Sequence, residues 1–303
     1  MSTFFEGKLI VVTGAASGIG RATVKILARH GALLSLADVN EDNLKAVKDE
    51  VLEIAAARNA TAAAGGDSSN SDNKPAQAPA EPVFTAVVDV RSQESCNRWI
   101  RDTLQHFESA GGGGGQQQRR IAGAANLAGV SNPPGRTEPV AARDIADPEL
   151  EFVWDVNVRG VVNSLRAELP HLQEGNGGRG GASVVNAGSI SGLMGLPGYL
   201  PYVSSKHAVI GITRTAAKEE GPKAIRINAI APGMIDTPLL RAVAESRGVD
   251  PSHEMFGSSA GPSPALDRLG EAEEVAEVIV FLLSPQSGYI NGAVIPIDGG
   301  LLI

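Results

Sequence analysis

The chain has 303 residues, of which 43% are hydrophobic, and it carries a formal net charge of −8 at pH 7. This length suits one large α/β domain or two small ones, and the acidic balance, without a dense Lys/Arg run, excludes the basic face that nucleic acid or an anionic membrane requires. Cys96 is the single cysteine, so the chain can form neither an internal disulfide nor a cysteine-based metal cluster. We therefore expect a small-molecule ligand and, without a secretion signal or an apolar stretch of ~18 residues, a cytoplasmic location.

Short apolar runs rich in β-branched residues alternate with longer amphipathic stretches along most of the chain. Helices are predicted from Gly18 to about His30 and from Glu41 to about Ala57, and the predicted strands are LIVVTG, LLSLAD, VFTAVVDV, IAGAANLAG, ASVVNAGS and AIRINAIAPG. This alternation predicts a doubly wound α/β fold, in which helices joined by right-handed crossovers cover both faces of a parallel sheet. Ligands bind such sheets beyond the carboxyl ends of the strands, so the residues after each apolar run are the functional candidates.

Two segments interrupt this alternation. Residues 57–82 are rich in Ala, Gly, Ser and Pro, and residues 109–120 are of low complexity. Neither segment offers enough apolar surface to offset the entropy of ordering it, so we expect disordered surface insertions within a single domain that spans residues 1–303. The alternative is a partner-binding role for one of them. A shorter glycine-rich stretch, 175–181, predicts a loop.

The first predicted strand runs directly into TGAASGIG, which places glycines at positions 14, 18 and 20 at the start of a helix. Without β-carbons the backbone can turn sharply and approach a pyrophosphate, which then lies at the positive end of that helix. The alternative is a tight turn with no ligand. The order of strand, glycine loop, helix and a second strand that ends in an acid favours a dinucleotide site.

Asp38 ends the second predicted strand, where its carboxylate can accept hydrogen bonds from the ribose hydroxyls of adenosine. It would repel a 2′-phosphate at ~4 Å by roughly 1 to 4 kcal/mol, depending on the effective dielectric. Neither the glycine loop nor the two residues after Asp38 supply a cation. The sequence thus predicts NAD(H) over NADP(H), without excluding the latter. The alternative is that Asp38 only caps the helix that begins near Glu41.

These motifs and their order resemble the short-chain dehydrogenase/reductase family in its common single-domain form. TGAASGIG matches the family's Thr-Gly-x-x-x-Gly-x-Gly loop, NLAG at 126–129 matches Asn-Asn-Ala-Gly with Leu127 in place of the second Asn, and VVDV matches a segment that contacts adenine. The resemblance implies a Rossmann α/β/α sandwich with a mainly seven-stranded parallel sheet, and it implies that Asn126 steadies the central strand. It implies cofactor contacts from Gly14, Ser17, Gly18, Ile19, Gly20, Asp38, Asp89, Val90, Asn126, Ala128 and Gly129.

The stretch GYLPYVSSKHAV at 198–209 contains the candidate for proton transfer. On a helix, Lys206 lies one turn after Tyr202, where a cation favours the phenolate. Tyr199 has Val203 at the same spacing, so we expect Tyr199 to be a packing or substrate-side residue. A Tyr-x-x-x-Lys pair alone often arises by chance, but a buried strand upstream ends at Ser189, at the edge of the sheet where ligands bind.

The resemblance implies a catalytic serine thirteen residues before the tyrosine, a spacing that Ser189 has and that Ser191 and Ser204 lack. Ser189 would hold a substrate oxygen while Tyr202 exchanges a proton with it. Lys206 would lower the pKa of the tyrosine from its ordinary ~10 and hold the nicotinamide ribose. By the same resemblance, the backbone of Asn157 supports a water linked to Lys206.

The last predicted strand runs into APGMIDTPL, which the family uses to turn the chain around the nicotinamide. The matching residues are Pro232, Gly233, Ile235 and Thr237, and the alternative is a turn without a ligand. The segment that follows occupies the position of a substrate lid, where His253, Met255 and Phe256 are candidates for substrate contact. Its pattern predicts a moderately apolar pocket.

Together these features predict an NAD(H)-dependent oxidoreductase that interconverts a secondary alcohol and a ketone. The alternatives are an NADPH-dependent ketoreductase of a biosynthetic pathway and a non-catalytic NAD(H)-binding sensor or scaffold. We expect no metal, because the five histidines are scattered and none pairs with an acid at ligand spacing. The resemblance implies a homodimer or homotetramer.

Overall fold

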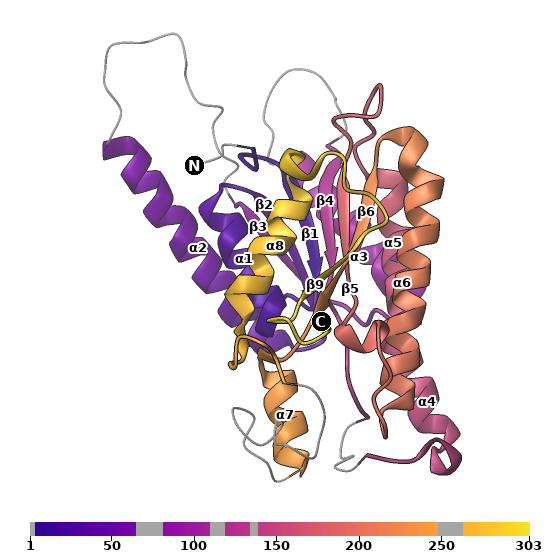
Figure 1. Cartoon of the computed structure of the whole chain (residues 1–303). Coiled ribbons are helices and arrows are strands. Elements are labelled where there is room, and N and C mark those ends of the chain that lie inside the picture. The colour runs from indigo at the N-terminus through magenta and orange to yellow at the C-terminus, as the bar shows by residue number, and fades with distance from the viewer. Residues whose placement is uncertain (1–3, 65–80, 110–118, 134–138, 248–262) are drawn as a thin grey trace.

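A parallel sheet forms the centre of the computed structural model, which describes residues 4–64, 81–109, 119–133, 139–247 and 263–303 (Figure 1). The sheet has seven strands in the order β3-β2-β1-β4-β5-β6-β9, and every neighbouring pair is parallel. Its strands are β1 (Leu9–Thr13), β2 (Leu33–Asp38), β3 (Val83–Val87), β4 (Ile121–Asn126), β5 (Ser183–Ala187), β6 (Arg226–Pro232) and β9 (Val294–Ile297). The order reverses between β1 and β4, which is where the doubly wound fold places its ligand. The predicted fold class is confirmed.

Helices cover both faces of the sheet (Figure 1). One hydrophobic core joins the sheet to α1 (Gly18–Arg29), α2 (Glu41–Ala64) and α8 (Ala272–Leu283). The other core joins it to α3 (Gln93–Ser109), α5 (Gly160–Glu168) and α6 (Leu200–Glu220), and α4 (Asp147–Trp154) packs beside α6. Because side chains alternate along a strand, β1 contributes to both cores: Ile10 and Val12 enter the first, while Leu9 and Val11 enter the second.

A smaller parallel pair of strands, β7 (Ile235–Asp236) and β8 (Gly270–Glu271), lies beside the carboxyl edge of the sheet with α7 (Pro238–Arg247). Glu271 and Glu274 form a reciprocal capping box at the start of α8, in which each side chain accepts a hydrogen bond from the other residue's backbone N–H. This cap fixes the point at which the chain leaves the small sheet and returns to the main one.

The structure corrects the predicted end of one helix. Helix α2 continues to Ala64, past the predicted end near Ala57, because residues 59–64 are mostly alanine, the residue with the highest helix propensity. The first part of the expected insertion at 57–82 is therefore helical, and residues 65–80 lie outside the described residues. The expected insertion at 109–120 begins at the last residue of α3, and its residues 110–118 also lie outside the described part.

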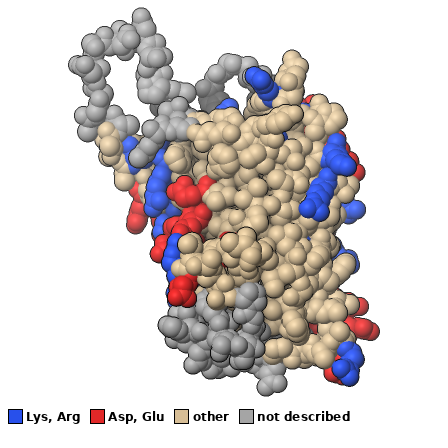
Figure 2. Space-filling model, in the orientation of Figure 1, with Lys and Arg blue, Asp and Glu red and all other residues tan. Residues whose placement is uncertain are grey.

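Acidic and basic side chains are mixed on the surface. Figure 2 shows them side by side over the region of α1, α2 and α8, next to a broad area of other residues. Ion pairs among the described residues include Arg21–Glu50 and Lys25–Glu50, which join α1 to α2. The face shown in Figure 2 has no broad region of basic charge alone.

Candidate active site

Two neighbouring cavities open at the carboxyl edge of the sheet. The first, of about 450 Å³, is here named the glycine-loop cavity, and the predicted residues that line it are Gly14, Ser17, Gly18, Ile19, Gly20, Asp38, Asp89, Val90, Ala128, Gly129 and Thr237. The second, of about 260 Å³, is named the tyrosine cavity, and the predicted residues that line it are Ile19, Gly129, Ser189, Tyr202, Lys206, Pro232, Gly233, Ile235 and Thr237. Ile19, Gly129 and Thr237 line both, so the cavities share a wall.

The glycine loop packs so tightly against neighbouring backbone that β-carbons at two of its positions would collide with it. Gly14 has φ +66°, and a β-carbon there would lie 2.7 Å from the backbone nitrogen of Ala128 on the facing loop. A β-carbon on Gly20 would lie 2.0 Å from the carbonyl oxygen of Gly14. The first turn of α1 contains no acidic residue, so the positive end of this helix is not neutralised locally. The loop and the helix start together form a cradle for an anionic pyrophosphate.

Asp38 lies at the end of β2 in the wall of the glycine-loop cavity. Its Oδ2 accepts a hydrogen bond from the Ala16 N–H at 3.0 Å, and its Oδ1 accepts one from the Asn40 N–H at 3.0 Å. Asn40 caps α2 instead, because its Oδ1 accepts the Asn43 N–H at 3.0 Å. The alternative in which Asp38 serves only as the helix cap is therefore wrong.

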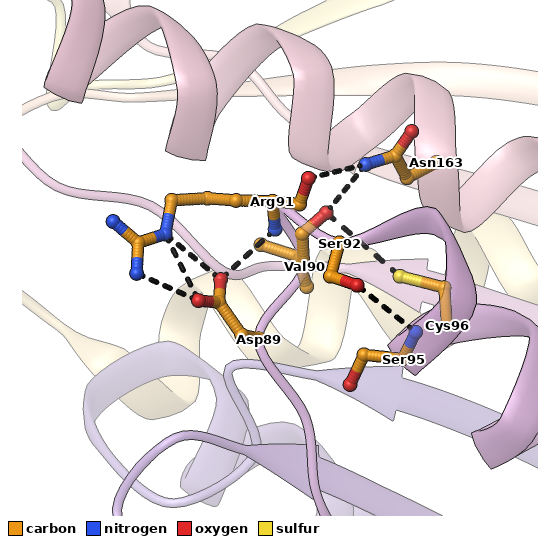
Figure 3. A network of polar contacts seen from close by, with 7 residues as sticks. All are labelled: Asp89, Val90, Arg91, Ser92, Ser95, Cys96 and Asn163. Atoms are coloured by element: carbon orange, nitrogen blue, oxygen red, sulfur yellow. Dashed lines mark hydrogen bonds and ion pairs between the residues drawn. The ribbon is translucent and has the colours of Figure 1, made fainter.

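The loop after β3 forms another wall of this cavity (Figure 3). Asp89 and Arg91 form a bidentate ion pair, with Arg91 Nη2 2.6 Å from Asp89 Oδ2 and Arg91 Nε 2.9 Å from Asp89 Oδ1. This pair lowers the pKa of Asp89 and holds the guanidinium over the ring of Phe152, 5.9 Å from its centroid. Arg91 was not among the sequence candidates, yet it is the one cation that lines this cavity among the described residues.

Asn163 of α5 fastens the same loop to the helix layer (Figure 3). Its Nδ2 donates to the carbonyl oxygens of Val90 at 2.9 Å and Arg91 at 3.0 Å. The Cys96 thiol also points at the Val90 oxygen, at 3.8 Å. Asn163 is 3% exposed, and its amide supplies a donor to the buried carbonyl of Val90 and to the carbonyl of Arg91. Sequence reasoning missed it; the only available signal was a polar residue on the inward face of a helix.

Asn126 lies beneath the cavities and lines neither of them. It is 2% exposed, and its Nδ2 donates to Asn186 Oδ1 at 3.1 Å and to Glu168 Oε2 at 3.2 Å. These contacts fit the expected support of the central strand. Direct contact with a cofactor does not follow from this placement.

The remaining candidates for chemistry meet in the tyrosine cavity. Tyr202 lies in the first turn of α6, Lys206 lies one turn later, and Ser189 begins the 3₁₀ turn after β5, where its Oγ accepts the Ser191 N–H at 3.1 Å. Ser189 also forms a side-chain hydrogen bond with Tyr202. The Lys206 Nζ lies 5.6 Å from the centroid of the Tyr202 ring and donates to the Ala187 carbonyl oxygen at 2.8 Å. The structure thus brings together the three residues that the sequence proposed.

The titration of this group differs from the sequence-based expectation. Burial raises the pKa of Tyr202, and the hydrogen bond with Ser189 lowers it by a smaller amount. Burial also lowers the pKa of Lys206 to about 8. The expectation that Lys206 lowers the pKa of Tyr202 is therefore corrected: removal from water is the dominant effect on both groups.

Asn157 lies in a π-helical turn, Asp155–Arg159, between α4 and α5. Its Oδ1 accepts the Val130 N–H at 2.9 Å, and its Nδ2 donates to the Val130 carbonyl at 2.8 Å and to Ser205 Oγ at 3.0 Å. Gly129 lies between this side chain and the lysine: a β-carbon there would be 3.2 Å from Asn157 Oδ1 and 3.3 Å from Lys206 Nζ. The side chain of Asn157 thus joins the loop after β4 to the start of α6, whereas the expected role concerned its backbone.

The turn after β6 closes the shared wall. The Gly233 N–H donates to the Ile297 carbonyl at 2.9 Å, and the Thr237 hydroxyl donates to the Ile235 carbonyl at 3.2 Å. Tyr199 is 5% exposed and lines the tyrosine cavity, which matches the expected packing or substrate-side role. The lid candidates His253, Met255 and Phe256 lie outside the described residues.

Within 4–64, 81–109, 119–133, 139–247 and 263–303, no three His, Cys, Asp or Glu side chains gather in a way that would hold a metal ion. No helix in those same ranges is long and apolar enough to cross a membrane.

The comparisons with known proteins agree with this geometry. The sequence matches a family model described as short chain dehydrogenase over residues 8–78 and one described as Enoyl-(Acyl carrier protein) reductase over residues 57–302. The short-chain dehydrogenase/reductase aba4 of Botryotinia fuckeliana (strain B05.10) is 42% identical over 302 residues, covering 98% of this chain and 97% of the relative. Levodione reductase of Leifsonia aquatica is 34% identical, covering 99% and 96%.

Solved structures give the same result. A crystal structure of levodione reductase matches with a TM-score of 0.77 and 32% identity, covering 98% of each chain. A 3-ketoacyl-(acyl-carrier-protein) reductase from Brucella melitensis, complexed with NADH, matches with a TM-score of 0.73 and 25% identity, covering 99% of this chain and 100% of that one. This chain belongs to the short-chain dehydrogenase/reductase family and is an oxidoreductase that acts on alcohol or ketone groups.

Proposed function

We propose that this enzyme interconverts a secondary alcohol and a ketone with NAD(H), and that Tyr202 exchanges the proton. The observation that carries the proposal is the meeting of Ser189, Tyr202 and Lys206 in the tyrosine cavity, directly beside the glycine-loop cavity. When bound, the nicotinamide supplies or accepts the hydride at the carbinol carbon. The residues of the chain bind both molecules, orient the substrate oxygen and move the proton.

Ser189 and Tyr202 divide the work at the substrate oxygen. In ketone reduction the Ser189 hydroxyl donates a hydrogen bond that holds the oxygen, and the Tyr202 hydroxyl gives it a proton as negative charge develops. Tyr202 is protonated near neutral pH, as an ordinary tyrosine is, and burial raises its pKa further. In alcohol oxidation the proton moves in the opposite direction, and Lys206 supports the phenolate that remains.

The preference for NAD(H) rests on Asp38. Each of its oxygens accepts one backbone N–H, which leaves lone pairs for the ribose hydroxyls of adenosine. A 2′-phosphate at this position would meet a carboxylate, and the neighbouring cation Arg91 is already held by Asp89. The NADH complex of the Brucella melitensis reductase supports the same choice. NADPH-dependent ketone reduction is the second candidate.

The tyrosine cavity favours a neutral, largely apolar substrate. Its described walls carry Ile190, Met194, Leu196, Met234, Leu240 and Val243, and Lys206 is their single charged side chain. A substrate carboxylate or phosphate would lose its hydration in this largely apolar cavity, where Lys206 is the one cation among the described lining residues. The names of levodione reductase and 3-ketoacyl reductase also point to ketone substrates. A cytoplasmic location and a homodimer or homotetramer remain predictions.

The test is a fluorescence titration of the purified protein with NADH and with NADPH, followed by a screen of ketones and secondary alcohols. We expect tighter binding of NADH and turnover of neutral cyclic or aliphatic ketones in preference to keto acids. Tighter binding of NADPH would overturn the role of Asp38. Preferred turnover of anionic substrates would contradict the proposed substrate class.

A further inference from the structure

Glu168 is a fully buried carboxyl group that the proposed reaction does not use. It ends α5 with 0% exposure, on the face that packs under β4. Its Oε2 accepts one hydrogen bond, from Asn126 Nδ2 at 3.2 Å, and its Oε1 has no hydrogen-bond partner among the described residues. No ion pair within the described ranges involves it.

Glu168 is the first member of a buried set that we name the polar ladder: Glu168, Asn126, Asn186 and Thr213. Asn126 Nδ2 donates to Asn186 Oδ1 at 3.1 Å, and Asn186 Nδ2 donates to Thr213 Oγ1 at 3.0 Å. All four residues are at most 2% exposed. The ladder runs from α5 through β4 and β5 to α6, and it crosses directly beneath the strand ends that carry the two cavities.

A count of donors and acceptors shows that the ladder lacks a proton. The two N–H groups of Asn126 are both used, and Asn126 Oδ1, like Glu168 Oε1, accepts nothing within the described part of the chain. An ionised carboxylate is acceptor-only and would leave both oxygens without a donor in a site closed to water. A protonated carboxyl group brings one O–H donor and removes the buried charge.

The surroundings of Glu168 agree with this count. Burial raises the pKa of Glu168 to about 7, while the hydrogen bond from Asn126 acts in the opposite direction. The other titratable group near it in the described chain is Cys96 of α3, and burial is the main reason that the pKa of this thiol is raised to about 12. Cys96 is therefore neutral, and no cation in the described part of the chain compensates a charge on Glu168.

We propose that Glu168 is a neutral carboxylic acid in the working enzyme and acts as a positioning residue, which holds Asn126 and thereby the loop that begins after it. Asn126 is the last residue of β4, and the next residues, Leu127 to Gly129, line the glycine-loop cavity. The Leu127 N–H donates to Thr13 Oγ1 at 3.2 Å, which fixes the far side of the same strand end. A charge on Glu168 draws water toward the ladder and loosens this wall.

The direction of the pH effect follows from linkage. The folded state binds the Glu168 proton more tightly than the unfolded state, so stability falls as pH rises between the ordinary value, about 4.5, and about 7. Above that window the stability that the Glu168 proton contributes is fully lost. The unfolding equilibrium constant should therefore rise through this group by roughly tenfold to a few hundredfold between pH 4.5 and pH 8.5.

The first experiment measures denaturant unfolding of the full chain from pH 4.5 to pH 8.5. It compares the wild type with Glu168→Gln, which is neutral at every pH, and with Glu219→Gln, the same change at an exposed position of α6. We expect the unfolding equilibrium constant of Glu168→Gln to lack this rise. The ratio of the wild-type constant to the variant constant should therefore be at least tenfold larger at pH 8.5 than at pH 4.5. Glu219→Gln should follow the wild type. Parallel profiles for the wild type and Glu168→Gln would overturn the neutral acid.

The positioning role has its own readout, which requires neither cofactor nor turnover. Hydrogen exchange of a peptide that contains Leu127 to Gly129 should be equal in the wild type and Glu168→Gln at pH 6. At pH 8.5 it should be severalfold faster in the wild type. Equal exchange at both pH values would overturn the positioning role, whatever the cofactor titration shows about the proposed function.

If Glu168→Gln fails to fold, infrared difference spectra of the wild type test whether Glu168 carries a proton. A neutral buried carboxylic acid gives a carbonyl band at pH 6 that disappears by pH 8.5. A spectrum of the folded wild type without that band at pH 6 would overturn the proposal.

Discussion

At the scale of single residues, the chemistry depends on one hydroxyl group. Tyr202 lies in a wall of apolar side chains with Ser189 as its hydrogen-bond partner. Removing that hydroxyl leaves the ring, the cavity shape and Lys206 in place. Removing the hydroxyl should therefore impair proton transfer and nothing else in the site.

Tyr202→Phe should lower kcat by roughly 10²- to 10⁴-fold, because general acid–base catalysis contributes about that much. The Kd for NADH should change less than about threefold, since no hydrogen bond of the glycine loop is touched. Steady-state kinetics and fluorescence titration measure the two quantities. Tyr289→Phe, at a fully exposed tyrosine, serves as the matched control. Near-normal turnover of Tyr202→Phe would remove Tyr202 from the mechanism.

Asp38→Asn should shift the cofactor preference toward NADPH. The amide oxygen can still accept a backbone N–H, but the negative charge that repels a 2′-phosphate is gone. The ratio of kcat/KM for NADPH to that for NADH should rise at least about fivefold, which corresponds to ~1 kcal/mol. The same ratio in Asp42→Asn, an exposed change on α2, should stay constant. An unchanged ratio in Asp38→Asn would mean that the preference arises elsewhere.

The buried Lys206 should lower the free energy of unfolding at neutral pH. Burial lowers its pKa to about 8, so the unfolded state binds the proton more tightly than the folded state between pH 8 and the ordinary value of 10.5. Stability due to this group therefore rises with pH across that window. Lys206→Met should raise the unfolding free energy at pH 7 by roughly 1 to 3 kcal/mol while nearly abolishing turnover. Denaturant unfolding of the wild type and Lys206→Met at pH 7 and pH 10 measures this difference in unfolding free energy. A variant that is less stable than the wild type at pH 7 would contradict the prediction.

At the scale of elements, α5 and the π-helical turn before it organise both cavities from behind. Asn157, Asn163 and Glu168 occur along this one stretch and fasten three different parts of the site. Asn157 holds the loop after β4, Asn163 holds the loop after β3, and Glu168 holds the end of β4. The helix layer thus sets the spacing between the cavity walls.

Asn163→Ala should weaken cofactor binding without changing the chemical step. It removes the amide donor from the buried carbonyl of Val90 and from the carbonyl of Arg91, and losing these hydrogen bonds should cost about 1 to 3 kcal/mol. Part of that cost should appear as a KM for NADH that is roughly 5- to 50-fold higher, while kcat changes less than about threefold. Asn59→Ala, at an exposed position of α2, is the control. A fall in kcat at unchanged KM would assign Asn163 to the reaction itself.

The sequence predicted six strands of the main sheet, the glycine loop and the Tyr202–Lys206 pair because each depends on local spacing, whereas Ser189 was chosen through the family resemblance. It could not predict Asn163 or Glu168, because the burial of a polar side chain on a helix depends on which loop or strand packs against it. The pKa direction of Tyr202 failed for the same reason: desolvation comes from cavity walls that are distant in sequence. The end of α2 was missed because alanine was interpreted as low complexity rather than as a helix former.

At the scale of the whole molecule, a dinucleotide would bridge elements that belong to both hydrophobic cores. The glycine loop starts α1 on one face, and Asp89 precedes α3 on the other. A ligand that binds only the folded chain stabilises all of it.

NADH at 100 times its Kd should therefore add about 2.7 kcal/mol to the unfolding free energy, which corresponds to a rise in Tm of roughly 4 °C for a chain of this size. NADPH at the same concentration should give a smaller shift. Differential scanning fluorimetry measures both. An equal or larger shift with NADPH would contradict the predicted cofactor preference.

The amino and carboxyl edges of the main sheet carry different features. Helices α2 and α3 end at Ala64 and Ser109, and the strands that follow them, β3 and β4, begin at Val83 and Ile121, at the amino edge of the sheet. The two cavities open at the carboxyl edge, a strand length of about 17 to 20 Å away. We therefore expect a tether attached near Ala64 or Ser109, at the amino edge, to leave both cavities facing solution.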